Sequence, residues 1–114
     1  MRGYPQPLTM SPDHLNYDYF TPLTGATVII LDGHNGAIIE PAGALAGLTV
    51  QLPTASAYYD GAVVKFSITQ AITTLTVTAT AGTVVAAGAA TTAAAGQGFG
   101  YVCSGVAAKW YRLY

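Results

Sequence analysis

The chain has 114 residues, a net charge of −1, and charged side chains at only 8% of positions, against about a quarter in ordinary soluble domains. The length fits one domain, and the four scattered basic residues argue against direct binding to nucleic acid or to an anionic membrane surface. The single cysteine, Cys103, excludes an intrachain disulfide framework, and no run of about 18 apolar residues predicts a transmembrane helix.

Residues 1–24 are predicted to form an extended arm rather than a folded unit. They contain four prolines and four aromatic residues and show no helical or strand period. Proline fixes its own φ angle and pushes the preceding residue into extended geometry. Because a solvated tail would avoid aromatic side chains, we expect the arm to pack on a neighbouring subunit or partner. Packing on its own domain, or partial disorder, is the alternative. The candidate residues for contact with a capsid or neighbour are Tyr4, Pro5, Tyr17, Tyr19 and Phe20.

A β domain is predicted over residues 25–114, beginning with a β-branched run at 27–32. The dipeptides Asp-Gly and Asn-Gly follow this run, and they favour a hairpin that returns through residues 37–40. The first strand is apolar at every position from 28 to 31, so both of its faces need cover. Ile29 and Leu31 share one of these faces and are therefore candidate trimer contacts.

Later strands alternate apolar and polar residues with the period of two that a half-buried sheet requires. In residues 74–80, threonine occupies every second position, and its hydroxyl keeps the outer face hydrated without charge. The segments 41–48 and 86–98 are predicted to be mainly loops. Short strands between glycine-rich turns indicate an all-β fold, a small antiparallel sandwich or barrel of jelly-roll-like form. Six further strands are predicted, at residues 48–53, 61–69, 74–80, 83–87, 98–104 and 108–114.

An uncharged β surface is prone to strand addition, because edges are normally guarded by lysine, proline or bulges. No charged residue occurs between Lys65 and Lys109. We therefore expect identical neighbours to cover much of this surface in a symmetric oligomer. The aromatic residues that close the chain, Trp110, Tyr111 and Tyr114, are either part of the core or trimer contacts.

Residues typical of catalysis or metal binding occur without a supporting pattern. His34 and Asp32 share a tight turn, and one imidazole with one carboxylate does not make a four-ligand zinc site. The pair Asp13-His14 has no nucleophile nearby, and Cys103 lies among apolar residues, as a buried structural thiol does. No catalytic, cofactor-binding or metal-binding residue is predicted, and an enzyme is not expected.

A glycine-rich stretch, GQGFG at residues 96–100, imitates a phosphate-binding loop. A dinucleotide-binding fingerprint needs a strand before the glycines and a helix after them. Here a strand-like run, YVCSG, follows instead. These glycines are interpreted as allowing a bulge or a close approach between strands.

The segments LTVQLP (48–53), ITTLTVTA (72–79) and KWYRLY (109–114), with the pattern DG-VV-F from Asp60, resemble a β-rich module of tailed-bacteriophage virions. Such modules occur in small capsid decoration, or cement, proteins and at the ends of tail fibres. The resemblance covers residues 25–114. It implies a trimeric, all-β, non-enzymatic virion component without a cofactor.

Within this class, a single module behind a short arm favours a capsid cement protein. The resemblance then implies a homotrimer that is made in the host cytoplasm and binds the major capsid protein on the capsid exterior. It would stabilise the shell by burying apolar area at the boundaries between capsomers. The alternative is a tail-fibre or head-fibre tip that binds a host receptor through Tyr58 and Tyr59 in the loop 54–61. A small hydrolase is the third hypothesis.

Overall fold

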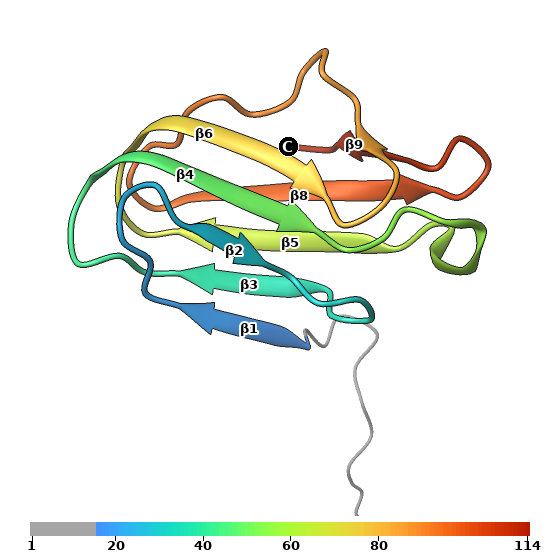
Figure 1. Ribbon diagram of the computed structural model, residues 1–114, viewed down its shortest axis with the longest axis horizontal. Helices are drawn as coiled ribbons and strands as arrows, with labels where there is room; N and C mark the ends of the chain where they lie inside the picture. Colours follow the sequence, from blue (N-terminus) through green and yellow to red (C-terminus); the bar gives the residue numbers. More distant parts are fainter. Residues whose placement is uncertain (1–15) are drawn as a thin grey trace, which may run out of the picture.

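A computed structural model describes residues 16–114, which form nine strands and one short 3-10 helix (Figure 1). All eight strands expected from the sequence are present, four of them shorter and three longer than predicted, and the all-β character is confirmed. The loop predicted at 41–48 is wrong from residue 45 onward, where a strand begins. The elements are β1 (Tyr17–Phe20), β2 (Thr27–Ile29), β3 (Gly36–Ile39), β4 (Leu45–Leu52), η2 (Ala57–Tyr59), β5 (Val63–Ile68), β6 (Ile72–Ala79), β7 (Thr83–Val84), β8 (Gln97–Ser104) and β9 (Lys109–Arg112).

The described strands are divided between two sheets. A six-stranded sheet has the order β1-β3-β5-β8-β9-β7, and a three-stranded sheet has the order β2-β4-β6. In the view of Figure 1 the three-stranded sheet lies in front of the six-stranded one. From β1 to β6 the chain alternates between the sheets, so that each pair of consecutive strands forms one coil and successive coils stack side by side.

The expected antiparallel, jelly-roll-like pairing is wrong for most of the fold. Five of the seven ladders between described strands are parallel, and only β5–β8 and β8–β9 are antiparallel. The physical reason is the alternation between sheets: the next strand in the same sheet arrives a full coil later, running in the same direction. Antiparallel pairing begins only where β8 and β9 follow each other within one sheet.

The turn after β2 illustrates why the predicted hairpin does not form. Gly33 adopts a left-handed φ of 84°, as an Asp-Gly turn requires. The Asp32 carboxylate then accepts hydrogen bonds from the backbone nitrogen and the hydroxyl of Thr54, at 2.7 and 3.0 Å. Because Thr54 follows β4, this contact fixes the turn against the corresponding corner of the next coil. The chain consequently crosses to the other sheet instead of folding back on β2.

A single core fills the space between the two sheets. Buried apolar residues of both sheets belong to one cluster, whose largest fully buried members are Trp110, Tyr101 and Phe99. The Trp110 indole nitrogen donates a hydrogen bond to the Pro53 carbonyl at 2.8 Å, and the Tyr101 hydroxyl accepts one from the Ala90 amide at 3.2 Å. When the polar atoms of large buried aromatic side chains are hydrogen-bonded, these side chains stabilise the core without the cost of an unpaired buried polar atom.

The two sheets end differently at their borders. Beyond β6, the segment after β7 returns along the sheet: the Leu75 amide donates to the Thr91 carbonyl, and Ile72 and Ala93 form an isolated bridge. At the opposite border, β1 and β2 are the edge strands of their sheets within residues 16–114. β1 comes from the predicted arm, so four of the arm's residues are a strand of the domain, paired in parallel with β3.

Candidate functional site

The outer face of the six-stranded sheet carries large, partly exposed apolar side chains. Outward positions alternate with buried ones along each strand, and the strand register aligns them into rows. One row across the strands contains Tyr19, Ile38, Ser67 and Gly98. Four further side chains on this face are aromatic or basic. We call this surface the tyrosine face; its side chains are Tyr17, Tyr19, Ile38, Lys65, Ser67, Tyr111 and Tyr114.

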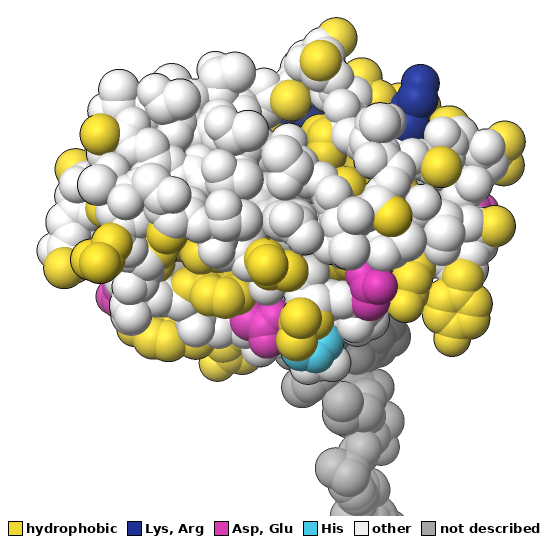
Figure 2. Space-filling model, viewed as in Figure 1, with side chains coloured by type: hydrophobic (Ala, Val, Ile, Leu, Met, Phe, Trp, Pro, Cys, Tyr) yellow, Lys and Arg dark blue, Asp and Glu magenta, His cyan; other side chains and the backbone are white. Residues whose placement is uncertain are grey.

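The outer face of the three-stranded sheet has the opposite character. The register places Thr27, Thr49 and Thr76 side by side across the three parallel strands. We call this surface the threonine face; its side chains are Thr27, Ile29, Thr49, Gln51, Thr74, Thr76 and Thr78. Figure 2 shows this side of the molecule as a broad area without charged side chains, with hydrophobic side chains gathered along its lower border. The predicted outward threonines of residues 74–80 are confirmed.

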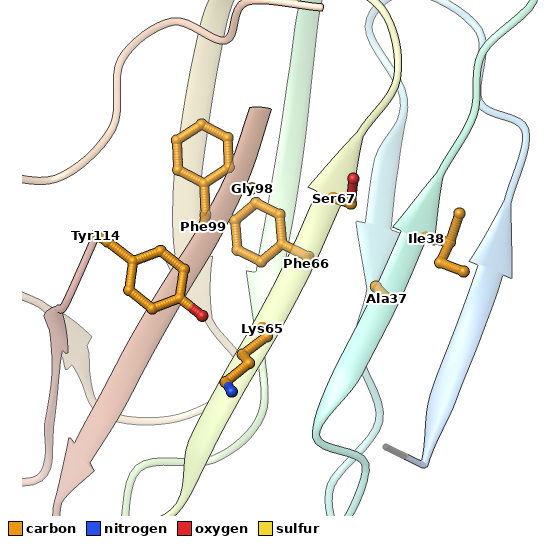
Figure 3. Close-up of a pocket in the computed structure, with 8 residues that line it drawn as sticks. All are labelled: Ala37, Ile38, Lys65, Phe66, Ser67, Gly98, Phe99 and Tyr114. Carbon is orange, nitrogen blue, oxygen red and sulfur yellow. The ribbon is translucent and has the colours of Figure 1, made fainter. Parts of the chain in front are cut away.

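A shallow cavity of about 230 Å³ opens on the tyrosine face (Figure 3). Tyr114 and Ile38 lie on opposite sides of it, with the strand that carries Lys65 and Ser67 between them. Gly98 forms part of the floor, beside the buried residues Ala37, Phe66 and Phe99. The lining is therefore apolar except for the Lys65 ammonium group and the hydroxyls of Ser67 and Tyr114.

Two glycines on β8 give this cavity its depth, and they have different reasons to be glycine. A Cβ at Gly100 would lie 2.7 Å from the Tyr114 ring, so the close approach of that ring requires glycine. The chain end is held there by the Leu113 amide, which donates to the Gly100 carbonyl at 2.7 Å. A Cβ at Gly98 would meet only the Phe66 carbonyl oxygen, at 3.9 Å, which is ordinary contact. A close approach between strands, as expected for these glycines, is therefore found at neither: the near neighbour of Gly100 is the Tyr114 side chain.

Hydrogen bonds and one ion pair fix β1 at the edge of the tyrosine face. The Tyr19 hydroxyl donates to the Glu40 carboxylate at 2.6 Å, and this bond is the main reason that the pKa of Tyr19 lies above its usual value. Both Asp18 carboxylate oxygens lie 3.0 Å from His34 Nδ1. His34 thus links its turn to β1, and within residues 16–114 no three His, Cys, Asp or Glu side chains gather into a metal-binding group.

The predicted arm contacts have separate positions. Tyr17 and Tyr19 lie on the tyrosine face and are 52% and 57% exposed. Phe20 alternates with them, is only partly exposed, and packs against the core. Tyr4 and Pro5 lie outside the described residues. Two of the five candidates therefore share a face that is available for contact with another molecule.

The predicted trimer contacts do not form one patch. Ile29 lies on the threonine face, in register with Gln51 and Thr78. Ile29 and Leu31 are partly exposed, while Val28 and Ile30 are buried, as the sequence pattern predicts. Tyr111 and Tyr114 belong to the tyrosine face, on the other sheet. Trp110 is 1% exposed and leaves no surface for a partner, so its interpretation as part of the core applies.

Two other sequence hypotheses concern residues near the turn after β4. Cys103 is buried, as predicted for a structural thiol. Tyr58, at 87% exposure, projects from the short helix η2, whereas the neighbouring Tyr59 packs against the core. The two rings meet edge to face, with centroids 4.8 Å apart. Of the two tyrosines, Tyr58 is therefore the one that is available at the surface.

Sequence reasoning missed Ile38, Lys65, Ser67 and Gly98 as members of one site. Each stands alone in its own strand, and only the register of β3, β5 and β8 brings them into adjacent rows. One signal was present: the alternation of Gly98 and Gly100 with large residues in β8 indicates a strand with an unoccupied outer face.

Comparisons with protein-family models, with curated proteins and with solved structures find no match for this chain. Among the described residues, no helix has the length and hydropathy to cross a membrane.

Proposed function

We propose that this chain is a structural, non-enzymatic protein of a tailed-phage particle, a homotrimeric cement protein that binds the major capsid protein on the outside of the shell. The phage assignment derives from the resemblance of residues 25–114. The observation that carries the binding role is the tyrosine face, where Tyr17, Tyr19 and Tyr114 are each more than half exposed and an apolar cavity opens beside Tyr114.

Physical chemistry favours protein as the partner of this face. Tyrosine is enriched in protein interfaces because its ring contributes apolar area and its hydroxyl remains satisfied at the rim. The outer face of this sheet carries two lysines, Lys65 and Lys109, which is too little charge for a nucleic acid or an anionic membrane. Contacts of this kind would add stability to a shell in proportion to the apolar area buried, at roughly 25 cal/mol per Å² before association costs.

Two measurements test the proposal. Native mass spectrometry of the purified protein is expected to give a trimer, and a monomer at micromolar concentration would overturn the homotrimer. Co-sedimentation with capsids of the phage that encodes the chain is expected to show saturable binding. A deletion of residues 1–15, which leaves β1 intact, is expected to weaken capsid binding while the trimer persists. Unchanged decoration by the truncated protein would remove the arm from the proposal.

A fibre tip that binds a host receptor is the second candidate, and Tyr58 is the observation that favours it. A tyrosine with 87% exposure on a short surface turn is suited to stacking on a sugar ring. A glycan array that gives binding lost in Tyr58→Ala, together with no binding to capsids, would favour the fibre tip over the cement protein.

A further inference from the structure

Gly98 is a glycine that its own domain does not require. It has no left-handed φ, and an added Cβ would meet nothing closer than 3.9 Å. Glycine in a strand weakens it relative to alanine, because it loses more backbone entropy on folding. A glycine kept inside a strand often marks a position where a ligand or another backbone approaches closely. The open space above Gly98 is the cavity on the tyrosine face.

The chemistry of this cavity suits an extended peptide that contains proline. Grooves with aromatic walls bind proline-rich segments, whose polyproline II conformation is formed before binding. Here the wall is the Tyr114 ring, with Ile38 opposite and the bare backbone of Gly98 below. Polyproline II leaves its carbonyl groups without internal hydrogen bonds. The Lys65 ammonium group and the Ser67 hydroxyl are placed to donate to such carbonyls.

The chain itself contains a segment with these properties. Residues 3–12, GYPQPLTMSP, have no charged side chain and three prolines, and Tyr4-Pro5-Gln6-Pro7 combines an aromatic ring with two of them. A neutral segment fits a cavity whose only charge is one ammonium group. Residues 1–15 precede the described part of the chain, which begins at Asn16.

The length of this segment allows it to reach the cavity. Tyr17 is aligned with Gly36, which is aligned with Lys65, so the start of β1 lies two strand spacings, or about 10 Å, from Lys65. Gln6 precedes Tyr17 by 11 positions. At about 3.3 Å per residue, this span reaches up to roughly 36 Å, which exceeds what a turn and the crossing of two strands require.

We propose that the cavity on the tyrosine face is a docking site for residues 4–7 of this chain, over Gly98 between Tyr114 and Ile38. This docking goes beyond the proposed capsid role, and because both use the tyrosine face, a capsid partner that enters the cavity would have to displace the segment. The docking would explain why position 98 is glycine. The cavity would also cover Tyr4 and its neighbouring prolines before any other partner binds.

Disulfide cross-linking in the full-length protein tests the docking. The double variant Gln6→Cys, Ser67→Cys is oxidised mildly and analysed on non-reducing gels. Rapid cross-linking is expected, because a disulfide needs Cα atoms within about 7 Å. A cross-link within one chain places the segment on its own cavity, and one between chains places it on a neighbour's cavity; both support the proposal. The native Cys103 is buried. Each single variant, Gln6→Cys or Ser67→Cys, measures any cross-linking that involves Cys103.

The matched control is Gln6→Cys, Thr76→Cys, which puts the second thiol on the threonine face. Thr76 is more exposed than Ser67, so random collision alone would favour the control. Equal or faster cross-linking at position 76 overturns the proposal. Gly98→Val in the Gln6→Cys, Ser67→Cys protein fills the floor of the cavity and is expected to slow cross-linking about tenfold, or roughly 1.4 kcal/mol. An unchanged rate in a folded Gly98→Val protein also overturns it.

Discussion

The tyrosine face and the threonine face rest on the same core, yet they solve the problem of an almost uncharged surface in different ways. On the threonine face, short β-branched side chains put a hydroxyl at the outward positions of three parallel strands, so water is retained without ions. On the tyrosine face, large exposed rings share the sheet surface with a cavity that is lined by Tyr114 and Gly98. The difference supports the proposal that the tyrosine face is the one that contacts protein.

The path of the chain explains how one sequence makes both faces. Between β1 and β6 each coil contributes one strand to each sheet, so residues that alternate along the chain are separated onto opposite sides of the molecule. The threonine face is closed at β6 by the returning segment around Thr91 and Ala93. The tyrosine face ends instead at β1, directly after the proline-rich segment.

The largest expected effect tests whether the two faces share one core. Trp110→Ala removes the largest buried side chain and its hydrogen bond to Pro53, which follows β4 in the other sheet. We expect a loss of about 3–5 kcal/mol in the free energy of unfolding, as for other buried tryptophans. Chemical denaturation measures it. A loss below about 1 kcal/mol would mean that the sheets do not depend on this contact.

The second prediction concerns binding to the capsid and compares equal charges on the two faces. Ile38→Arg places a cation beside the cavity and near Lys65, whereas Thr76→Arg places one on the threonine face. Neither change is expected to alter folding by more than about 0.5 kcal/mol, because both positions are on the surface. Ile38→Arg is expected to weaken binding to the capsid at least about tenfold, or roughly 1.4 kcal/mol, and Thr76→Arg to leave it unchanged.

Co-sedimentation with capsids measures both dissociation constants. An equal loss in the two variants would mean that net charge, rather than the identity of the face, controls association. A loss confined to Thr76→Arg would reverse the assignment of the contact face.

The two faces differ in how far the sequence alone could predict them. The threonine face was predictable, because its pattern lies within single strands and alternation fixes which side chains share a face. The tyrosine face could not be predicted, because it joins residues from four parts of the chain. Its assembly depends on parallel register between strands that are 19 to 29 residues apart, such as Tyr17, Gly36 and Lys65. The hairpin dipeptides in the sequence favoured antiparallel pairing of neighbouring strands. The side chain that instead fixes the direction of this turn, Asp32, acts through a hydrogen bond with Thr54 of a later coil, which the local sequence does not reveal.

The third prediction compares two glycines of one strand. Gly100→Ala forces the Tyr114 ring away, because its Cβ would lie 2.7 Å from the ring, and we expect a loss of about 1–2 kcal/mol. Gly98→Ala has open space and is expected to be neutral or to stabilise by up to about 1 kcal/mol. Thermal and chemical unfolding of both variants measure the contrast. Equal destabilisation would mean that Gly98 is required by the fold itself, and the argument for a ligand above it would fail.

The smallest expected effect is a pH dependence at the edge of the tyrosine face. The hydrogen bond to Glu40 raises the pKa of the Tyr19 hydroxyl in the folded protein above its ordinary value near 10. A raised pKa means that the folded state holds this proton more tightly than the unfolded state. The contribution of the bond to stability is therefore complete below about pH 10 and is lost as the pH rises through the folded-state pKa. In Tyr19→Phe this dependence should disappear.

The measurement is the difference in unfolding free energy between the native protein and Tyr19→Phe as a function of pH, with phenolate absorbance followed in parallel. The difference should be constant from neutral pH to about pH 9 and then shrink. Tyr17→Phe is the matched control, because it removes a hydroxyl from the same strand and the same face. A difference that grows above pH 10, or one reproduced by Tyr17→Phe, would show that the bond to Glu40 does not hold β1. The edge of the tyrosine face would then be fixed by the Asp18–His34 ion pair and the backbone ladder alone.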